Sequence, residues 1–325
     1  MASHVPAVTL PNGSKMPMVG LGTYQGHGDE MRRVLAWALE CGYRHIDTAA
    51  AYQNEAAIGD VLHEWLSSGR IAREELFVVT KLPPIANRAG DVGRFLQESL
   101  TKLRLSYVDL YLIHDPVGLK ANSDDGRPFD SEGNCLLDFD TDLEGVYKAL
   151  EEQVDAGKAK AIGLSNFNSK QIERIYKVCR IKPANLQVEV HVYHQQKALR
   201  EVCRDFGISI CAYSPLGAPY MVKGSDEYPI LLQHPVVTSL AKRLGRTPAQ
   251  VLLRFLIQNQ ILVIPKSTNQ ERVKENFQLF DFELSKEDMA SLEALDRKGD
   301  GRIYDFKEIF KGIEKHPEWT FHIPY

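Results

Sequence analysis

The chain has 325 residues, of which 44% are hydrophobic and 25% charged, a composition typical of a folded globular protein and unlike that of a disordered or fibrous one. Its 39 Lys and Arg against 43 Asp and Glu give a net charge of −4, so no overall basic field attracts nucleic acid or an anionic membrane. The five cysteines form no C-x-x-C pair, which disfavours a disulfide framework or a zinc site and predicts a reduced, cytoplasmic protein. Neither secretion nor membrane insertion is expected, because the N-terminus lacks a signal-peptide pattern and no apolar run approaches about 18 residues.

Short apolar runs recur along the chain, separated by turn residues and by stretches with helical spacing. A clear helix is expected over Asp91–Leu103, where Val92, Leu96 and Leu100 fall on one face. Continuous apolar strands that alternate with helices predict parallel strands, and eight such units predict a (β/α)8 barrel. Since no linker composition divides the chain, we expect a single domain over residues 1–325. The predicted strands are Val19–Gly22, Arg44–Asp47, Phe77–Thr80, Val108–Ile113, Ala161–Leu164, Leu186–Val190, Ile208–Ala212 and Ile261–Ile264.

Four segments do not fit this repeat. Val8–Lys15 contains an Asn-Gly pair and predicts an N-terminal β-hairpin that closes the floor of the barrel. Residues 115–140 and 217–230 are long connections, and residues 297–325 form a tail whose aromatic side chains either close a substrate pocket or pack against the barrel wall. Because barrels carry their sites on the loops that follow the strands, we expect these last three segments to be substrate loops.

Reactive side chains stand at the carboxyl ends of three consecutive predicted strands. Asp47 ends the second strand and Tyr52 follows it, Lys81 comes just after the third, and His114 comes just after the fourth. Taken singly, each is an ordinary salt-bridge, loop or turn residue. Their joint arrival at one rim of a barrel predicts a catalytic set.

Several ordered motifs surround these residues: Gly42 to Glu55, Leu105 to Pro116, Ala161 to Phe167, Ala212 to Gly217 and Ile264 to Thr268. With them the chain resembles the aldo-keto reductase superfamily nearly end to end, in particular its aldose and aldehyde reductases. The resemblance implies a monomeric barrel that reduces aldehydes or ketones with NADPH, with Asp47, Tyr52, Lys81 and His114 as the catalytic tetrad. Tyr24 and Asp115 stand where many vertebrate members have tryptophan, which gives a faint likeness to invertebrate, especially insect, members.

The chemistry of the tetrad follows from the charges that carbonyl reduction creates. Hydride addition to a carbonyl carbon leaves charge on the oxygen, so the site needs a proton donor and a positive field. Tyr52 is the expected donor, and the Lys81 ammonium is expected to lower the pKa of its phenol. Asp47 would hold the ammonium in place, and a neutral His114 would orient the carbonyl.

The chain has neither a G-x-G-x-x-G nor a P-loop motif, so a dinucleotide must bind in another way. Thr268 and Glu271 predict a capping box that starts a helix after the eighth strand, and its N-terminus, with basic residues around it, predicts an anion site. The resemblance implies that Lys266, Ser267 and Arg272 bind the 2′-phosphate of NADPH, with Thr268 also a cofactor contact. It implies as well that Glu275 and Asn276, expected to be clear of the core, bind the adenine.

The resemblance also implies the remaining ligand contacts. For the cofactor they are Ser165, Asn166 and Gln187 on the nicotinamide carboxamide, Tyr213 stacked under the ring, Ser214 and Leu216 on the pyrophosphate, and Thr23 and Tyr24 near the ribose. Asp47 is a further cofactor contact. For the substrate they are Tyr24, Tyr52, His114 and Asp115.

Two other functions stay open from the residues. A barrel that binds NADPH without catalysis, or has a structural role, would not need all four tetrad residues. A metal-dependent hydrolase is disfavoured because His114 has no H-x-H companion, so no metal is expected.

Overall fold

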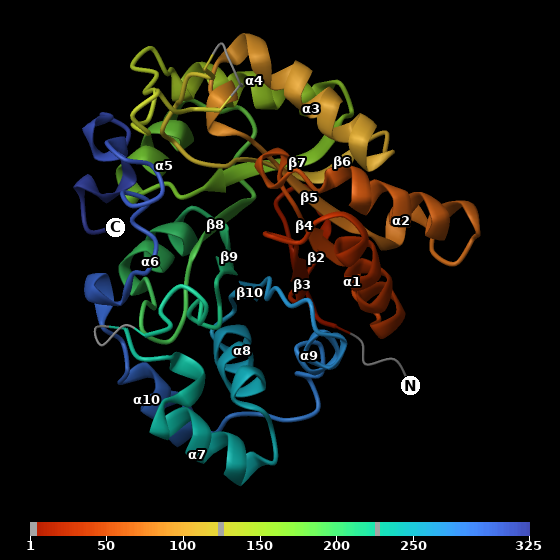
Figure 1. The fold of residues 1–325 in the computed structure, drawn as a ribbon, viewed down its shortest axis with the longest axis vertical. Coiled ribbons are helices and arrows are strands. Elements are labelled where there is room, and N and C mark those ends of the chain that lie inside the picture. The colour runs from red at the N-terminus through yellow and green to blue at the C-terminus, as the bar shows by residue number, and fades with distance from the viewer. Residues whose placement is uncertain (1–4, 123–126, 225–227) are drawn as a thin grey trace.

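The computed structural model describes residues 5–122, 127–224 and 228–325 (Figure 1). Eight parallel strands form one sheet in the order β10-β9-β8-β7-β6-β5-β4-β3. A parallel bridge between Val19 and Val263 joins the first strand to the last, so the sheet closes into the predicted (β/α)8 barrel. All eight predicted strands are confirmed, with ends shifted by up to two residues. They are β3 (Gly20–Gly22), β4 (His45–Asp47), β5 (Phe77–Leu82), β6 (Val108–Ile113), β7 (Ala159–Ser165), β8 (Asn185–Glu189), β9 (Ser209–Tyr213) and β10 (Leu262–Val263).

Helices surround the barrel (Figure 1). The predicted helix over Asp91–Leu103 is α3, and its face with Val92, Leu96 and Leu100 is buried. Leu103 is also buried, because the apolar stripe faces the strands and the neighbouring helices. The helices are α1 (Gly28–Cys41), α2 (Glu55–Ser67), α3 (Ala89–Leu103), α4 (Leu143–Asp155), α5 (Ser169–Val178), α6 (Lys197–Asp205), α7 (Pro235–Leu244), α8 (Pro248–Gln258), α9 (Gln270–Glu275) and α10 (Lys286–Glu293).

The predicted N-terminal hairpin consists of β1 (Ala7–Thr9) and β2 (Lys15–Pro17), which pair antiparallel. Gly13 has a φ of 84°, a conformation that glycine adopts without strain. Leu10 and Met16 are buried in one cluster with inward-facing residues of the strands, including Phe77. The hairpin therefore fills the end of the barrel opposite the strand carboxyl ends, as expected.

The C-terminal tail packs on the outside of the barrel and on the long connection after β6. The ring of Phe310 stacks on Phe129 at 5.8 Å between centroids, and Glu318 forms an ion pair with Arg174 of α5 at 2.8 Å. Figure 1 shows the tail running beside α5 and α6. These contacts attach the tail to α5 and to the connection after β6, and whether the tail also closes a substrate pocket stays a prediction. Residues 123–126 and 225–227 of two predicted substrate loops lie outside the described residues.

Candidate active site

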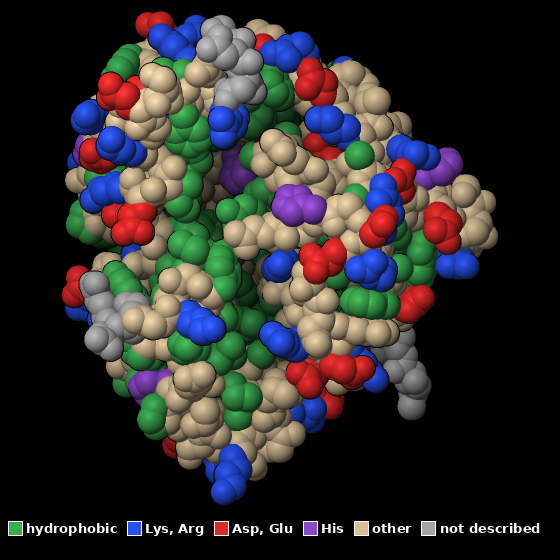
Figure 2. All heavy atoms as spheres, in the orientation of Figure 1, with side chains coloured by type: hydrophobic (Ala, Val, Ile, Leu, Met, Phe, Trp, Pro, Cys, Tyr) green, Lys and Arg blue, Asp and Glu red, His purple; other side chains and the backbone are tan. Residues whose placement is uncertain are grey.

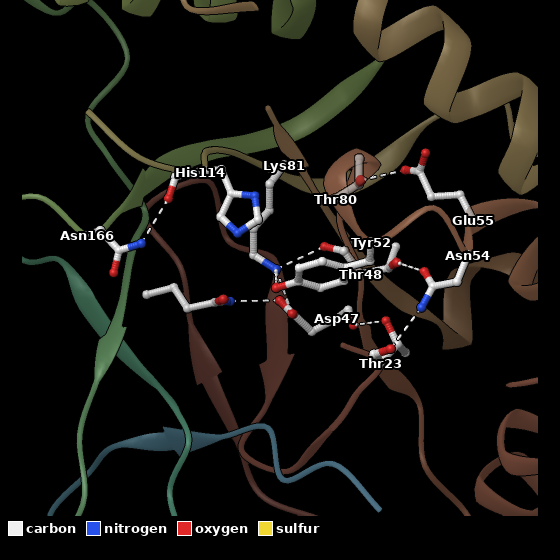
Figure 3. Close-up of polar contacts among 11 residues, drawn as sticks. Thr23, Asp47, Thr48, Tyr52, Asn54, Glu55, Thr80, Lys81, His114 and Asn166 are labelled. Atoms are coloured by element: carbon white, nitrogen blue, oxygen red, sulfur yellow. Dashed lines mark hydrogen bonds and ion pairs between the residues drawn. The ribbon is translucent and has the colours of Figure 1, made fainter. Parts of the chain in front are cut away.

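The ends of β4, β5 and β6 bring the four predicted catalytic residues together (Figure 3). Parallel strands carry their carboxyl ends to one rim, and a short 3-10 helix (Ala50–Tyr52) directly after β4 turns Tyr52 back over it. Lys81 Nζ lies 2.6 Å from Asp47 Oδ1 and 3.3 Å from Tyr52 Oη. The His114 ring meets the Tyr52 ring edge-on, with centroids 5.5 Å apart.

The Lys81 ammonium is completely buried and has three oxygen partners. Besides Asp47 and Tyr52, it donates to the backbone carbonyl of Thr48 at 2.9 Å. Burial alone would lower the pKa of the Lys81 ammonium, but the charge of Asp47 and its hydrogen bonds raise it above its usual value. Gln187 from the opposite side of the barrel donates to the other carboxylate oxygen of Asp47 at 2.7 Å. The site therefore holds a fixed positive charge beside a phenol.

Tyr52 differs from expectation in the direction of its pKa. Burial raises the pKa of the phenol above its ordinary value, and the nearby Lys81 ammonium opposes this rise without reversing it. The physical reason is that a phenolate at this rim loses more hydration than one ammonium returns. The phenol is consequently protonated at neutral pH, and the Lys81 charge favours the phenolate that forms when the proton leaves.

His114 is neutral in this environment. Burial, together with the nearby Lys81 charge, lowers the pKa of its imidazole well below the usual value. Its backbone is fixed on both sides, because its N–H donates to Leu82 O at 3.1 Å and its carbonyl accepts from Asn166 Nδ2 at 3.1 Å. The Nδ1 atom is buried without a hydrogen-bond partner among the described residues.

The residues predicted to hold the nicotinamide lie next to this set. The Tyr213 hydroxyl at the end of β9 donates to Asn166 Oδ1 at 2.9 Å, and the Asn166 N–H donates to Gln187 O at 3.0 Å. Ser165, the last residue of β7, is buried beside them. Asn166 has a φ of 62°, which turns the chain sharply at the strand end. The structure thus joins residues from β7, β8 and β9 and the turn after β7 into one polar surface beside the tetrad.

The residues predicted to bind the 2′-phosphate of the cofactor lie where the first and last strands of the barrel meet. Gly22 packs so closely on the last strand that a Cβ there would lie 2.5 Å from the Ile264 carbonyl and 3.5 Å from Lys266 Cβ. This contact brings Thr23, just after β3, to the segment that begins at Lys266. Lys266 and Arg272 are exposed, and within the described ranges neither forms an ion pair with a carboxylate.

Two expectations for this segment are wrong. Asn269, not Thr268, caps the following helix, because the Asn269 side chain accepts from the Arg272 N–H at 3.0 Å while Thr268 lies one residue outside. Asn276 is only 3% exposed, since α9 ends at Glu275 and the chain turns into the core there. Glu275 stays partly exposed, as does Ser267.

The remaining predicted contacts border the rim. Ser214 has a φ of 48° and accepts from the Gly217 N–H in a turn that contains the partly buried Leu216. Tyr24 is 46% exposed, and its ring centroid lies 5.2 Å from that of Tyr52. Asp115 follows His114 and accepts from the Val117 N–H at 2.9 Å, and burial raises the pKa of its carboxyl to about 7.

The sequence reasoning did not single out several residues that the structure brings to the rim. The Tyr304 hydroxyl of the tail lies 2.7 Å from that of Tyr220, and the Tyr304 ring lies 5.9 Å from Tyr213. Thr48 and Asn54 lie in the motif from Gly42 to Glu55. The sequence pattern does not show whether the Asn54 amide caps the helix that follows it or binds two neighbouring loops. Figure 2 shows a hollow in this face of the molecule, with hydrophobic side chains gathered along it.

Two properties of the described residues bear on other functions. No helix there has the length and apolar character needed to cross a membrane. No group of three or more His, Cys, Asp and Glu side chains is arranged there to hold a metal ion. The fold and the site together define a barrel protein that presents a phenol, an ammonium and an imidazole at the carboxyl ends of its strands.

Comparisons with known proteins identify the family. The aldo/keto reductase family model matches residues 18–297. Aldo-keto reductase family 1 member A1 of Gallus gallus is 39% identical over 329 residues, with 100% of both chains covered, and the Danio rerio member A1-A is 41% identical over 323 residues, covering 98% of this chain and 99% of its own. The chain therefore belongs to the aldo/keto reductase family, as its motifs predicted.

Solved structures agree. The aldose reductase of Schistosoma japonicum superposes with a TM-score of 0.89 at 41% identity, covering 98% of this chain and 99% of that one. An aldo-keto reductase of Bombyx mori in complex with NADP superposes with a TM-score of 0.86 at 35% identity, covering 98% and 100%.

Proposed function

We propose that Tyr52, Lys81, Asp47 and His114 carry out carbonyl reduction in this chain. As a member of its family, the protein is an NADP-dependent oxidoreductase that converts an aldehyde or ketone to an alcohol. The observation that supports the catalytic assignment is the 3.3 Å contact between the buried Lys81 ammonium and the Tyr52 hydroxyl.

The proposed roles follow from the charges at the rim. When bound, NADPH supplies the hydride for the carbonyl carbon. The protonated Tyr52 phenol gives its proton to the carbonyl oxygen, and Lys81 stabilises the phenolate left behind until solvent returns a proton. Asp47 offsets the burial of the ammonium, and a neutral His114 imidazole donates a hydrogen bond that orients the carbonyl.

The proposed cofactor site suits a phosphorylated dinucleotide. Lys266 and Arg272 are exposed cations without an ion-pair partner among the described residues, which favours a 2′-phosphate there. Ser267 and Thr268 lie between them, and Glu275 remains accessible for the adenine. Because Asn276 is buried, we propose that it contacts the adenine through only one edge of its side-chain amide.

The proposed nicotinamide and substrate contacts are those around the tetrad. For the cofactor we propose Ser165, Asn166, Gln187, Tyr213, Ser214, Leu216, Thr23 and Tyr24. For the substrate we propose Tyr24, Tyr52, His114 and Asp115, which border the rim.

A barrel that only binds NADPH is the weaker candidate. Such a protein gains nothing from a fully buried ammonium, whose removal from water costs several kcal/mol before its partners offset it. We further propose a single domain over residues 1–325 that works as a monomer in the cytoplasm, supported by five cysteines that are all free thiols. Light scattering of the purified protein tests the monomer.

The test of the catalytic assignment is Tyr52→Phe. This variant keeps the ring and loses the proton, so carbonyl reduction should fall at least ~100-fold while NADPH still quenches protein fluorescence with the same Kd. Turnover of an aromatic aldehyde is followed as loss of NADPH absorbance. Unchanged turnover would remove Tyr52 from the mechanism, and quenching by wild-type protein without turnover would favour the binding protein.

A further inference from the structure

Asn54 has the position of a helix cap but does not cap. It is the residue before α2 (Glu55–Ser67), where asparagine normally accepts a hydrogen bond from a backbone N–H of the first turn. Its side chain makes no such bond and is only 2% exposed. Figure 3 shows the amide directed toward Thr23 and Thr48. A strong local preference is therefore given up for other contacts.

Those contacts join two loops of the barrel rim. Asn54 Nδ2 donates to the carbonyl oxygens of Thr23 at 2.8 Å and Gly26 at 3.0 Å, both in the loop after β3. Its Oδ1 accepts from the Thr48 hydroxyl at 2.9 Å, in the loop after β4. One buried amide thus has both of its donors and its acceptor engaged between these loops.

Both loops touch the Lys81 and Asp47 pair directly. The Thr48 carbonyl is one of the three acceptors of Lys81 Nζ, at 2.9 Å. The Thr23 hydroxyl donates to the backbone carbonyl of Asp47 at 2.8 Å. Two of the three groups that Asn54 holds by its side chain, those of Thr23 and Thr48, therefore belong to residues that contact this pair through another atom.

We propose that Asn54 is a positioning residue for carbonyl reduction, which fixes Thr48 so that its carbonyl keeps the Lys81 ammonium beside the Tyr52 hydroxyl. The inference rests on the proposed function, because it acts only through the tetrad. Without Asn54, the Thr48 hydroxyl and the loop after β3 lose their common partner, and Lys81 Nζ is free to move toward Asp47 alone. A displacement of about 1 Å at a catalytic group is enough to lower a rate by about two orders of magnitude.

A positioning role and a purely structural role differ in their effect on pH dependence. The groups that face the Tyr52 hydroxyl are Lys81 from β5, Asp47 from β4, His114 after β6 and Tyr24 after β3. Of these only Lys81 lowers the pKa of Tyr52, so a displaced ammonium raises that pKa and moves the basic limb of the reduction profile to higher pH. Loss of stability alone leaves the limb in place.

The experiment compares Asn54→Ala and Thr48→Val with Gln195→Ala. Gln195 is a matched control, since its buried amide also donates to backbone carbonyls, those of Val192, Leu292 and Glu293. We expect Asn54→Ala and Thr48→Val each to lower kcat about tenfold or more, to raise the pH of the basic limb, and to leave the Kd for NADPH within about threefold. Gln195→Ala should lose comparable thermal stability and keep its kcat and limb.

Two further variants make the test decisive. Thr48→Ser keeps the hydroxyl and should retain the wild-type kcat and limb. The Asn54→Ala, Thr48→Val double variant should be no slower than Asn54→Ala alone, because Asn54→Ala already breaks the contact that Thr48→Val removes. The proposal is overturned if Asn54→Ala keeps kcat within about twofold of wild type, or if Thr48→Val does so where Asn54→Ala does not fold. A slower Asn54→Ala with an unshifted limb overturns it as well. Full activity in Tyr52→Phe would instead overturn the proposed function itself.

Discussion

Replacement of Lys81 by methionine is the most direct perturbation of the electrostatics of this site. The side chains have similar length, so Lys81→Met removes the charge and largely keeps the volume. At the 3.3 Å between Lys81 Nζ and Tyr52 Oη, an ammonium and a phenolate attract by about 5 kcal/mol at an effective dielectric constant of about 20. If about half of this survives solvent and the relaxation of neighbouring groups, the reduction rate falls by about two orders of magnitude.

The same substitution also affects stability, because it leaves the buried Asp47 carboxylate without its counter-charge. Breaking a buried pair from one side costs about 3–5 kcal/mol, so Lys81→Met should melt at a lower temperature than the wild type. Adding Asp47→Asn removes the unpaired charge and should recover part of this stability. It should not recover kcat, which separates the effect on catalysis from the effect on folding.

The assay measures kcat for an aromatic aldehyde against pH, together with NADPH binding by fluorescence and unfolding by urea. The expected result is a kcat that is low at every pH and a Kd for NADPH that is nearly unchanged. The basic limb of the profile should move to higher pH, because Lys81 no longer lowers the pKa of Tyr52. A Lys81→Met protein that binds NADPH and turns over within about threefold of wild type, while Tyr52→Phe is inactive, would refute the electrostatic reasoning.

Three other outcomes follow from the structure. Lys266→Ala should weaken NADPH binding about tenfold or more and leave NADH binding nearly unchanged, as measured by fluorescence titration. Equal Kd values for NADPH and NADH in the wild type would contradict the assignment of Lys266 to the 2′-phosphate. Burial lowers the pKa values of His45 and His194 to about 4, so both imidazoles are neutral in the folded protein. Their contribution to the free energy of unfolding is therefore complete above pH ~6.5 and is lost as the pH falls toward 4. For His45 the loss is about 3 kcal/mol. Urea unfolding at several pH values measures this decrease, and a flat profile from pH ~7 to ~4.5 would show that these histidines do not control it. Removal of residues 297–325 should change the ranking of carbonyl substrates more than the Kd for NADPH, and an equal loss of both would mean that the tail serves only to pack the barrel.

The eight strands and the position of the tetrad were predictable because they depend on local patterns. An apolar run bounded by turn residues indicates a buried strand whatever surrounds it, and parallel strands deliver their carboxyl ends to one rim. Asp47, Lys81 and His114 could therefore be assigned to a common site although up to 67 residues separate them in the sequence. The hairpin at the barrel floor was predictable for the same reason, from its Asn-Gly turn.

What the sequence pattern left undecided concerns where individual side chains point and how far they are buried. The same type of residue caps a helix at Asn269 and binds two loops at Asn54, because the choice depends on which acceptors and donors the fold brings within reach. The burial of Asn276 reflects where a helix ends against the core.

The sequence by itself thus determined the barrel, its family and which polar side chains meet at its rim, since these follow from periodicity and from ordered motifs. Only the tertiary structure decided their environment: Gln187 reaches Asp47 across 140 residues, and burial outweighs Lys81 in setting the direction of the Tyr52 pKa. Desolvation and charge interactions depend on all neighbours in space, and those neighbours come together only when the barrel closes.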